Sequence, residues 1–221
     1  MLKPLNYDQT PVQGEFTPIE LGQHHLIIKQ VNETSTKYEI ETAGRQGREP
    51  DKNMIVVLYD FSPSDRQPGL LMEEYKNDTK PDKKWPSRGT KYIPMYDRDG
   101  NTARGFKTFC TCFERSNGTT VQWVEGAQWA VQFKNKKIGG AFGEVHSVYN
   151  GKETIKHELR WFVTDDKVDP EKIPNVVELT ADQRAELHAV AGSVSAAATY
   201  QAAHDDFLNI PESEEENLPF K

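Results

Sequence analysis

The sequence predicts a domain that is mostly β, with a few helices, over residues 14–177. Three observations predict it: segments rich in β-branched and aromatic residues, turn formers that interrupt them at short intervals, and an Asn150-Gly151 dipeptide between the last two segments. Asn-Gly suits the positive φ angles of a tight hairpin turn. A hairpin over residues 138–163 is therefore the firmest structural expectation.

Seven segments of this region are predicted to form strands. Each is rich in apolar, β-branched or aromatic residues and is bounded by turn formers. They are residues 25–32, 36–41, 53–61, 91–96, 128–133, 138–149 and 153–163. The glycines of residues 139–143 fall inside one of these strands, so we expect them to permit a bulge or sharp curvature and not to cradle phosphate.

Two further segments carry helical patterns. Residues 102–115 predict a short capping helix, because their apolar side chains share one helical face at Phe106, Phe109, Cys110 and Phe113. A strand is the alternative, since the segment also alternates from Phe106 to Cys112. Farther along, Thr180 and Gln183 have the spacing of a capping box, which predicts a helix that begins there.

Composition divides the chain into four parts. Residues 1–13 form an N-terminal arm, and residues 14–177 form the β-rich domain. Residues 178–204 hold the short C-terminal helix and then a flexible linker of small residues. Residues 205–221 form a disordered acidic tail. Hydrophobic residues make up only 36% of the chain and charged residues 28%, so part of it is expected not to pack.

Net charge is distributed unevenly along the chain, which carries −7 in total. Six carboxylates against Lys221 give residues 205–221 a charge of −5, and residues 178–204 carry the remaining −2. Residues 1–177 are therefore neutral in sum. A neutral domain still allows a basic groove, because phosphate binding depends on where the charges lie.

Hydropathy and cysteine usage predict a cytosolic protein. No apolar run reaches about 18 residues, and the first ten residues lack a signal-peptide core. The two cysteines, Cys110 and Cys112, have no Cys or His cluster around them. This argues against a disulfide framework and a zinc site, and we expect both thiols to pack as small apolar groups.

Candidate catalytic and metal-binding residues are sparse. The sequence has no GxxxxGK[ST] loop. The histidines are scattered, and the adjacent His24 and His25 would point to opposite faces of a strand, so a surface role is expected for them. Residues 97–101 are predicted to form a turn, since Thr108 stands where a calcium loop requires Glu. We expect no catalytic residue, no metal and no cofactor.

Basic and aromatic residues are interleaved in three stretches of the β-rich domain. Lysine and arginine track phosphates, and aromatic faces stack on unpaired bases at roughly 1–3 kcal/mol per base, so this mixture is typical of proteins that bind single strands. About half of the strand aromatics are expected to be core residues instead. The candidate DNA-binding residues are Lys83, Lys84, Trp85, Arg88, Lys91, Tyr92, Tyr96, Arg104, Lys107, Trp129, Phe133, Lys134, Lys136 and Lys137.

Trp85 is a better candidate than the strand aromatics. It lies between Lys84 and Pro86 in a polar loop, with no apolar neighbours in the chain to pack against. An exposed Trp beside lysines indicates a ligand, so we expect this ring to stack on a base. The lysines of residues 134–137 carry less weight, because lysine runs are usually solvated.

The end of the chain combines a spaced run of acids with a final apolar residue, Pro219 and Phe220. It resembles the acidic tip of bacterial single-stranded DNA-binding proteins, although Lys221 follows Phe220 where that family usually ends. The resemblance implies a tail that docks in basic, apolar pockets on replication, recombination and repair proteins, and that competes for the protein's own DNA groove. The residues implied are Asp205, Asp206, Phe207, Glu214, Glu215, Glu216, Leu218, Pro219 and Phe220.

The β-rich domain carries a second, looser resemblance. Residues 105–107, 136–139, 149–163 and 165–168 look like the barrel of phage-encoded single-stranded DNA-binding proteins. This implies an OB-type barrel, in which residues 102–115 form the capping helix. It also implies a bacteriophage origin and a place in the cytoplasm of a bacterial host.

The sequence thus predicts a non-enzymatic protein that binds and protects single-stranded DNA without sequence preference and recruits other proteins through its tail. No membrane partner is expected, and self-association into a homo-oligomer is left open. One alternative is a metal-dependent DNA enzyme that uses Asp165, Asp166 and Asp169 as ligands. The other is a phage interaction protein that uses its tail to bind host replication proteins and never touches DNA.

Overall fold

The computed structural model describes residues 17–124 and 127–187. These residues fall into two compact units. The first lies within Met1–Val145 and His157–Val176, and the second within His146–Lys156 and Val177–Lys221.

Several sequence-based expectations lie outside this part of the chain. They are the N-terminal arm of residues 1–13, the linker beyond residue 187 and the acidic tail of residues 205–221. Within the described ranges, no helix is long and apolar enough to span a membrane.

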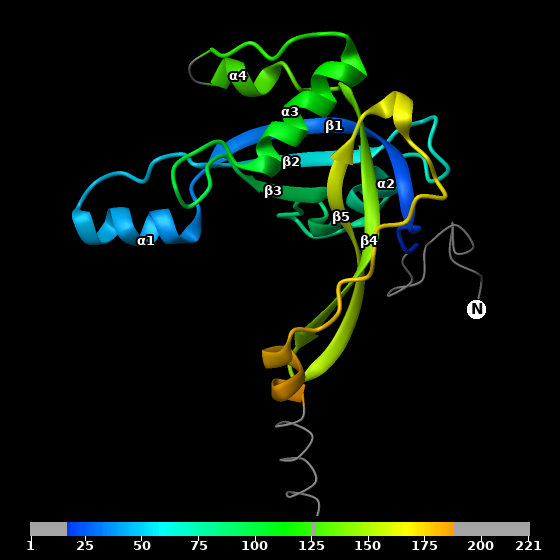
Figure 1. Ribbon diagram of the computed structural model, residues 1–221. Helices are drawn as coiled ribbons and strands as arrows, with labels where there is room; N and C mark the ends of the chain where they lie inside the picture. The colour runs from blue at the N-terminus through cyan, green and yellow to red at the C-terminus, as the bar shows by residue number, and fades with distance from the viewer. Residues whose placement is uncertain (1–16, 125–126, 188–221) are drawn as a thin grey trace, which may run out of the picture. The chain divides into compact units, whose positions relative to one another are not determined.

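A five-stranded antiparallel sheet organises the chain, in the order β3-β2-β1-β4-β5 (Figure 1). Strand β1 pairs with both β2 and β4, and β2 pairs with β3. The strands are β1 (Gly22–Thr34), β2 (Met54–Phe61), β3 (Thr90–Pro94), β4 (Lys137–Tyr149) and β5 (Lys152–Val163). The prediction of a mostly β protein with a few helices is confirmed at this level.

The hairpin between β4 and β5 is confirmed in detail. Asn150 and Gly151 adopt φ angles of 51° and 69°, as a two-residue turn between strands of right-handed twist requires. Within the second unit, His146 Nδ1 lies 2.6 Å from Glu153 Oε1 across the hairpin.

Helix α3 (Arg104–Asn117) confirms the helix predicted between β3 and β4. It crosses the sheet (Figure 1) and ends at Gly118, whose φ of 59° suits a left-handed cap. The Phe109 ring lies 5.2 Å from that of Phe133 and 5.1 Å from that of Phe162 on β5. The residues of α3 that enter the core are Phe106, Phe109, Cys110, Cys112 and Phe113.

The strand predicted over residues 36–41 is wrong, because helix α1 (Lys37–Gln46) forms there. The Thr36 hydroxyl accepts a hydrogen bond from the Glu39 main-chain N–H at 3.2 Å, which caps the helix. Gly47 ends the helix with a left-handed φ of 66°. The alternation of this segment is therefore outweighed by its two helix caps.

The strand predicted over residues 128–133 is also wrong, because helix α4 (Ala127–Val131) and a turn replace it. Trp129 and Phe133 are four residues apart and both buried, with ring centroids 4.8 Å apart. A spacing of four residues places two side chains on one face of a helix and also on one face of a strand, so it fits both conformations. The turn of residues 132–135 after α4 gives Phe133 its place in the core.

Helix α2 (Leu70–Asn77) was not expected. It begins after Gly69, whose φ is 66°, and it buries Leu71 against the core. Two short 3₁₀ turns are also present, η1 (Ser87–Gly89) and η2 (Asp165–Lys167).

The helix predicted at Thr180 is confirmed over its first turns, through residue 187. The Thr180 hydroxyl accepts from the Gln183 N–H at 3.2 Å, and the Gln183 side-chain oxygen accepts from the Thr180 N–H at 3.0 Å. These two bonds are the expected capping box.

The glycines of β4 allow close packing, and residues 137–142 form no bulge against β1. The β1–β4 register runs without a shift from Gly22 opposite Phe142 to Ile27 opposite Lys137. A Cβ on Gly140 would lie 2.5 Å from the Leu26 side chain. The bulge in this part of the sheet lies in β1 instead, between Ile28 and Gln30.

The surface role expected for the histidines is wrong for His24, which is fully buried. Its Nδ1 lies 2.9 Å from Asp65, and its ring packs edge-on against Phe61 and Phe142. His25 points away from this cluster, with its Nδ1 2.8 Å from Asp165. The two rings thus face opposite ways, as neighbours in a strand must.

Candidate nucleic-acid interface

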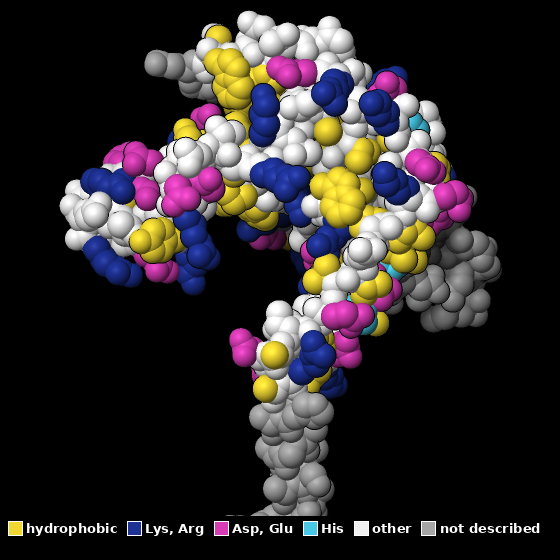
Figure 2. Space-filling model, in the orientation of Figure 1, with side chains coloured by type: hydrophobic (Ala, Val, Ile, Leu, Met, Phe, Trp, Pro, Cys, Tyr) yellow, Lys and Arg dark blue, Asp and Glu magenta, His cyan; other side chains and the backbone are white. Residues whose placement is uncertain are grey.

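The outward face of α3 carries a strip of basic side chains. They lie over a shallow depression of about 650 Å³. Figure 2 shows Lys and Arg side chains along α3, with apolar side chains over α4 and β5 beside them. The residues that line the depression are Thr102, Arg104, Lys107, Thr108, Thr111, Cys112 and Arg115. We call Arg104, Lys107 and Arg115 the α3 basic strip.

The cations of the α3 basic strip are exposed and form no ion pair with any described carboxylate. Between them along the helix, the Thr108 hydroxyl donates to the Arg104 carbonyl at 2.9 Å, and Thr111 also lines the depression. Uncompensated cations along one helical face suit a row of phosphates. Arg115 was missed from the sequence, although its spacing from Thr108 and Thr111 places it on the same helical face.

An exposed tyrosine adjoins this strip. Tyr96 is 53% exposed and pairs with Thr102 in an isolated β-bridge, and Thr102 lines the α3 depression. The Ala103 N–H also donates to the Met95 carbonyl at 2.8 Å, which ties the end of β3 to the start of α3. Two sequence candidates, Arg104 and Lys107, therefore line the depression, and a third, Tyr96, is bridged through its backbone to Thr102, which also lines it.

A second exposed tyrosine lies on the solvent face of the sheet. Tyr92 of β3 is 59% exposed and stands opposite Val56 of β2, which in turn stands opposite Asn32 of β1. This row presents an aromatic ring, a half-buried aliphatic group and an exposed amide on adjacent strands. Such a surface offers stacking and hydrogen bonding to an unpaired base.

The expectation that Trp85 lacks apolar neighbours is wrong. Its ring centroid lies 5.7 Å from that of Tyr75, and it packs against the hydrophobic core. The indole N–H donates to the Gly89 carbonyl at 3.0 Å. Tyr75 and Gly89 are ten and four residues away in the chain. The polar residues next to Trp85 in the sequence therefore did not indicate how its ring packs.

Trp129 and Phe133 are core residues in this structure, 3% and 0% exposed. Rings buried to this extent have no face open to a base. Their apparent association with the lysines that follow them reflects sequence proximity, since α4 and the turn after it direct both rings into the core.

Two candidate cations already have partners within the protein. The Lys91 ammonium donates to the Leu159 carbonyl of β5 at 2.7 Å, and burial lowers the pKa of this lysine. Arg88 donates to Glu74 at 2.7 Å and to the Thr17 carbonyl at 2.7 Å. Both side chains therefore tie elements of the fold together.

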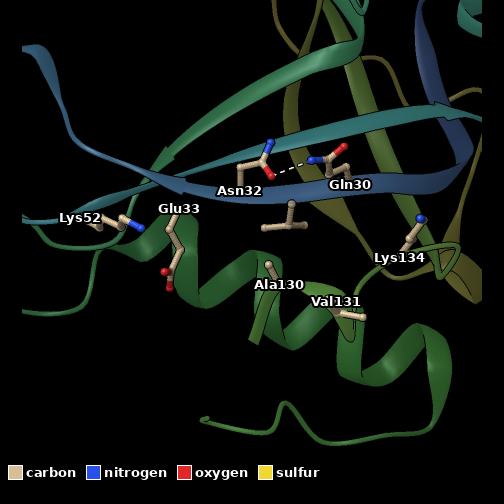
Figure 3. Close-up of a pocket in the computed structure, with 8 residues that line it drawn as sticks. Gln30, Asn32, Glu33, Lys52, Ala130, Val131 and Lys134 are labelled. Atoms are coloured by element: carbon tan, nitrogen blue, oxygen red, sulfur yellow. Dashed lines mark hydrogen bonds between the residues drawn. The ribbon is translucent and has the colours of Figure 1, made fainter. Parts of the chain in front are cut away.

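The remaining lysine candidates are dispersed. Lys84 is exposed, and the Lys83 ammonium lies 4.8 Å from the centre of the Tyr75 ring. Lys136 and Lys137 are exposed where β4 begins. Lys134 lines a separate groove of about 480 Å³ between β1 and α4, with Lys52 at its other end (Figure 3).

Burial favours the neutral forms of the two cysteines and of Tyr59. Burial raises the pKa of the Cys110 thiol to about 12 and also raises the pKa of Cys112 and of Tyr59. Thiols of this kind are weak nucleophiles at neutral pH. Both cysteines pack as the small apolar groups expected from the sequence.

Acidic residues do not gather around a common point in the described ranges. No group of three or more His, Cys, Asp or Glu side chains there has the arrangement of a metal site. Asp165 pairs with His25, and its main-chain N–H donates to the Ser116 hydroxyl at 2.9 Å. The turn of residues 97–101 is held by Asp97, which accepts from the N–H groups of Asp99 and Asn101.

Comparison with known proteins assigns no function to these residues. No protein-family model matches the chain, and no curated protein matches its sequence. The expected interaction residues of the tail, from Asp205 to Phe220, lie outside the described residues.

Proposed function

We propose that the chain is a non-enzymatic protein that binds single-stranded DNA without sequence preference. The observation that carries the proposal is the α3 basic strip, unpaired with any described carboxylate, beside the exposed ring of Tyr96. Cations to follow the phosphates and aromatic faces to stack on the bases are the two elements that such binding needs.

The strand order supports an OB-type barrel as the scaffold. The order β3-β2-β1-β4-β5, with a helix between β3 and β4, is that of a five-stranded Greek-key barrel opened between its third and fifth strands. Lys91 connects these two strands, because its ammonium on β3 binds a carbonyl on β5. In this fold the faces of the second and third strands commonly bind oligonucleotides, and Tyr92 lies on that face here.

Single-stranded DNA is favoured over duplex as the ligand. The faces of the bases are covered by their neighbours in a duplex, so exposed tyrosine rings gain stacking energy only from unpaired bases. Contacts of this type do not depend on base identity, and the ligand is therefore expected to be bound with little sequence preference.

The acidic tail supplies the second half of the proposal, the recruitment of replication, recombination and repair proteins. Residues 205–221 carry −5 and end in Leu218, Pro219, Phe220 and Lys221. Carboxylates can pair with basic rims on a partner while the phenylalanine fills an apolar pocket. The same charge repels DNA phosphates and is attracted to cations such as those of α3.

Fluorescence anisotropy with labelled oligo-dT and a matching duplex tests the proposal. The full chain is expected to prefer the single strand and to bind it more weakly as salt rises. A chain ending at residue 204 is expected to bind equally or more tightly but to lose partner recruitment. Equal affinity for the single strand and the duplex would contradict the proposed single-strand binding. Recruitment that survives truncation would contradict the proposed role of the tail.

A further inference from the structure

Trp123 is a large apolar side chain left open to solvent. It is 69% exposed and lies in the segment between α3 and α4. Its ring stacks on that of Trp129, with centroids 6.2 Å apart and planes inclined by 27°. Its other aromatic neighbour is Phe106 of α3, at 6.2 Å and 61°.

The supporting rings are buried and in mutual contact. Phe106 and Trp129 are 6% and 3% exposed, and their centroids lie 6.1 Å apart. Trp129 in turn contacts Phe133 in the core at 4.8 Å. The Trp129 indole N–H has no hydrogen-bond partner among the described residues, so packing alone holds this ring. Trp123 is thus the outermost member of an aromatic stack that continues into the core.

The backbone beside Trp123 is fixed by hydrogen bonds. The Gln132 amide clamps Gln122 by accepting from its N–H at 2.8 Å and donating to its carbonyl at 3.0 Å. The Val121 N–H donates to the Glu114 carboxylate at 2.9 Å, and Val121 is buried. The exposed ring is therefore positioned in advance, which lowers the entropic cost of binding a flat ligand.

The α3 basic strip and this stack share the first turn of α3. Phe106, which contacts the Trp123 ring, is buried on the inward face of that turn, whereas Arg104 and Lys107 are exposed on it. Because a helix is about 10–12 Å across with its side chains, a polyanion held by these two cations would pass within roughly that distance of Phe106. Val124 and Val131 are also exposed, and they would suit an apolar surface of a partner protein. An apolar partner, however, would leave Arg104 and Lys107 unpaired.

We propose that the Trp123 ring is a stacking platform for one base of the single strand whose phosphates follow the α3 basic strip. This inference rests on the proposed function and adds a contact outside the sheet. The platform accepts any base, because each presents a π-face.

The test compares Trp123→Ala and Trp123→Phe with Tyr38→Ala, which removes a similarly exposed ring from α1. Two probes are used in anisotropy titrations: oligo-dT, and an abasic strand of equal length that keeps the phosphates and lacks the bases. Circular dichroism melting confirms that each variant is folded.

Trp123→Ala is expected to weaken oligo-dT binding roughly 5- to 100-fold, with Trp123→Phe intermediate and Tyr38→Ala unchanged. Binding of the abasic strand, and the salt dependence of oligo-dT binding, should be the same in Trp123→Ala as in the parent chain. Quenching of tryptophan emission by oligo-dT should decrease in Trp123→Phe.

Wild-type affinity of a folded Trp123→Ala for oligo-dT would overturn the platform while leaving the proposed function in place. Self-association of the parent chain that Trp123→Ala abolishes, with DNA affinity unchanged, would assign the ring to a protein contact and overturn the platform as well. Failure of the parent chain to bind any single strand would instead refute the proposed function.

Discussion

Removal of the α3 basic strip should change how DNA binding depends on salt. In the triple variant Arg104→Ala, Lys107→Ala and Arg115→Ala, three exposed cations that lack described carboxylate partners are lost. Each phosphate contact on a single strand contributes about 0.7 to the slope of log K against log salt, so the slope should become shallower by about 2. Exposed ion pairs contribute about 0.2–1 kcal/mol each, so the loss of three predicts a rise in Kd of roughly 3- to 160-fold at low salt.

The assay is anisotropy with oligo-dT across a series of salt concentrations. A control variant, Lys37→Ala with Arg45→Ala and Lys172→Ala, removes the same formal charge from exposed positions outside α3. It should retain most of the parent slope. Equal slope changes in the two variants would show that only net charge matters, and would refute a specific path along α3.

The further predictions concern the sheet, the core and helix α1. Tyr92→Ala should weaken oligo-dT binding by roughly 1–3 kcal/mol without changing the salt slope, because a stacking contact and not an ionic one is lost, as anisotropy would show. Gly140→Ala should lower the free energy of unfolding by about 1–3 kcal/mol in urea titrations, since the added Cβ would meet Leu26 at 2.5 Å and Leu159 at 2.6 Å. A Cβ on Gly44 of helix α1 would meet nothing within 4 Å, so Gly44→Ala should raise the free energy of unfolding by up to about 1 kcal/mol. A Gly140→Ala variant more stable than Gly44→Ala would contradict the close packing at Gly140. Burial raises the pKa of Asp65, but hydrogen bonds from His24 and from main-chain N–H groups outweigh it, so the folded pKa lies below the ordinary 3.8. The charged Asp65 carboxylate therefore adds its full contribution to the free energy of unfolding above pH 3.8, and this contribution is lost as the pH falls through the lower folded pKa. Urea titrations from pH 7 to pH 2 should show this loss in the parent chain and not in Asp65→Asn.

The hairpin and α3 were predictable because local and tertiary preferences agree there. Asn150-Gly151 permits one tight turn geometry, and the apolar residues of α3 fall on the face that the sheet buries. The capping box at Thr180 is likewise a purely local signal.

The failures arose where two periodicities competed over a short segment. In α1 the alternation suggested a strand, while the Thr36 cap and Gly47 favoured a helix and prevailed. At α4 the four-residue spacing of Trp129 and Phe133 fits a strand as well as a helix, and the two rings join the core from the helix and from the turn after it. Five or six residues are too few for periodicity alone to separate these cases.

The candidate site was only half predictable. Tyr92, Tyr96, Arg104 and Lys107 are exposed as expected, whereas Trp85 finds partners in Tyr75 and Gly89 that its sequence neighbours do not reveal. Trp123 and Arg115 were overlooked for the converse reason. Their roles depend on an aromatic stack and a helix face that exist only after folding.

Photo-cross-linking with an oligonucleotide that carries 5-iododeoxyuridine tests the path of the single strand most directly. Mass spectrometry of the adducts is expected to find Tyr92 or Tyr96, the exposed tyrosines nearest to the proposed path. Adducts confined to exposed tyrosines elsewhere, such as Tyr38 on α1, with none on β3 or its end, would contradict the proposed interface.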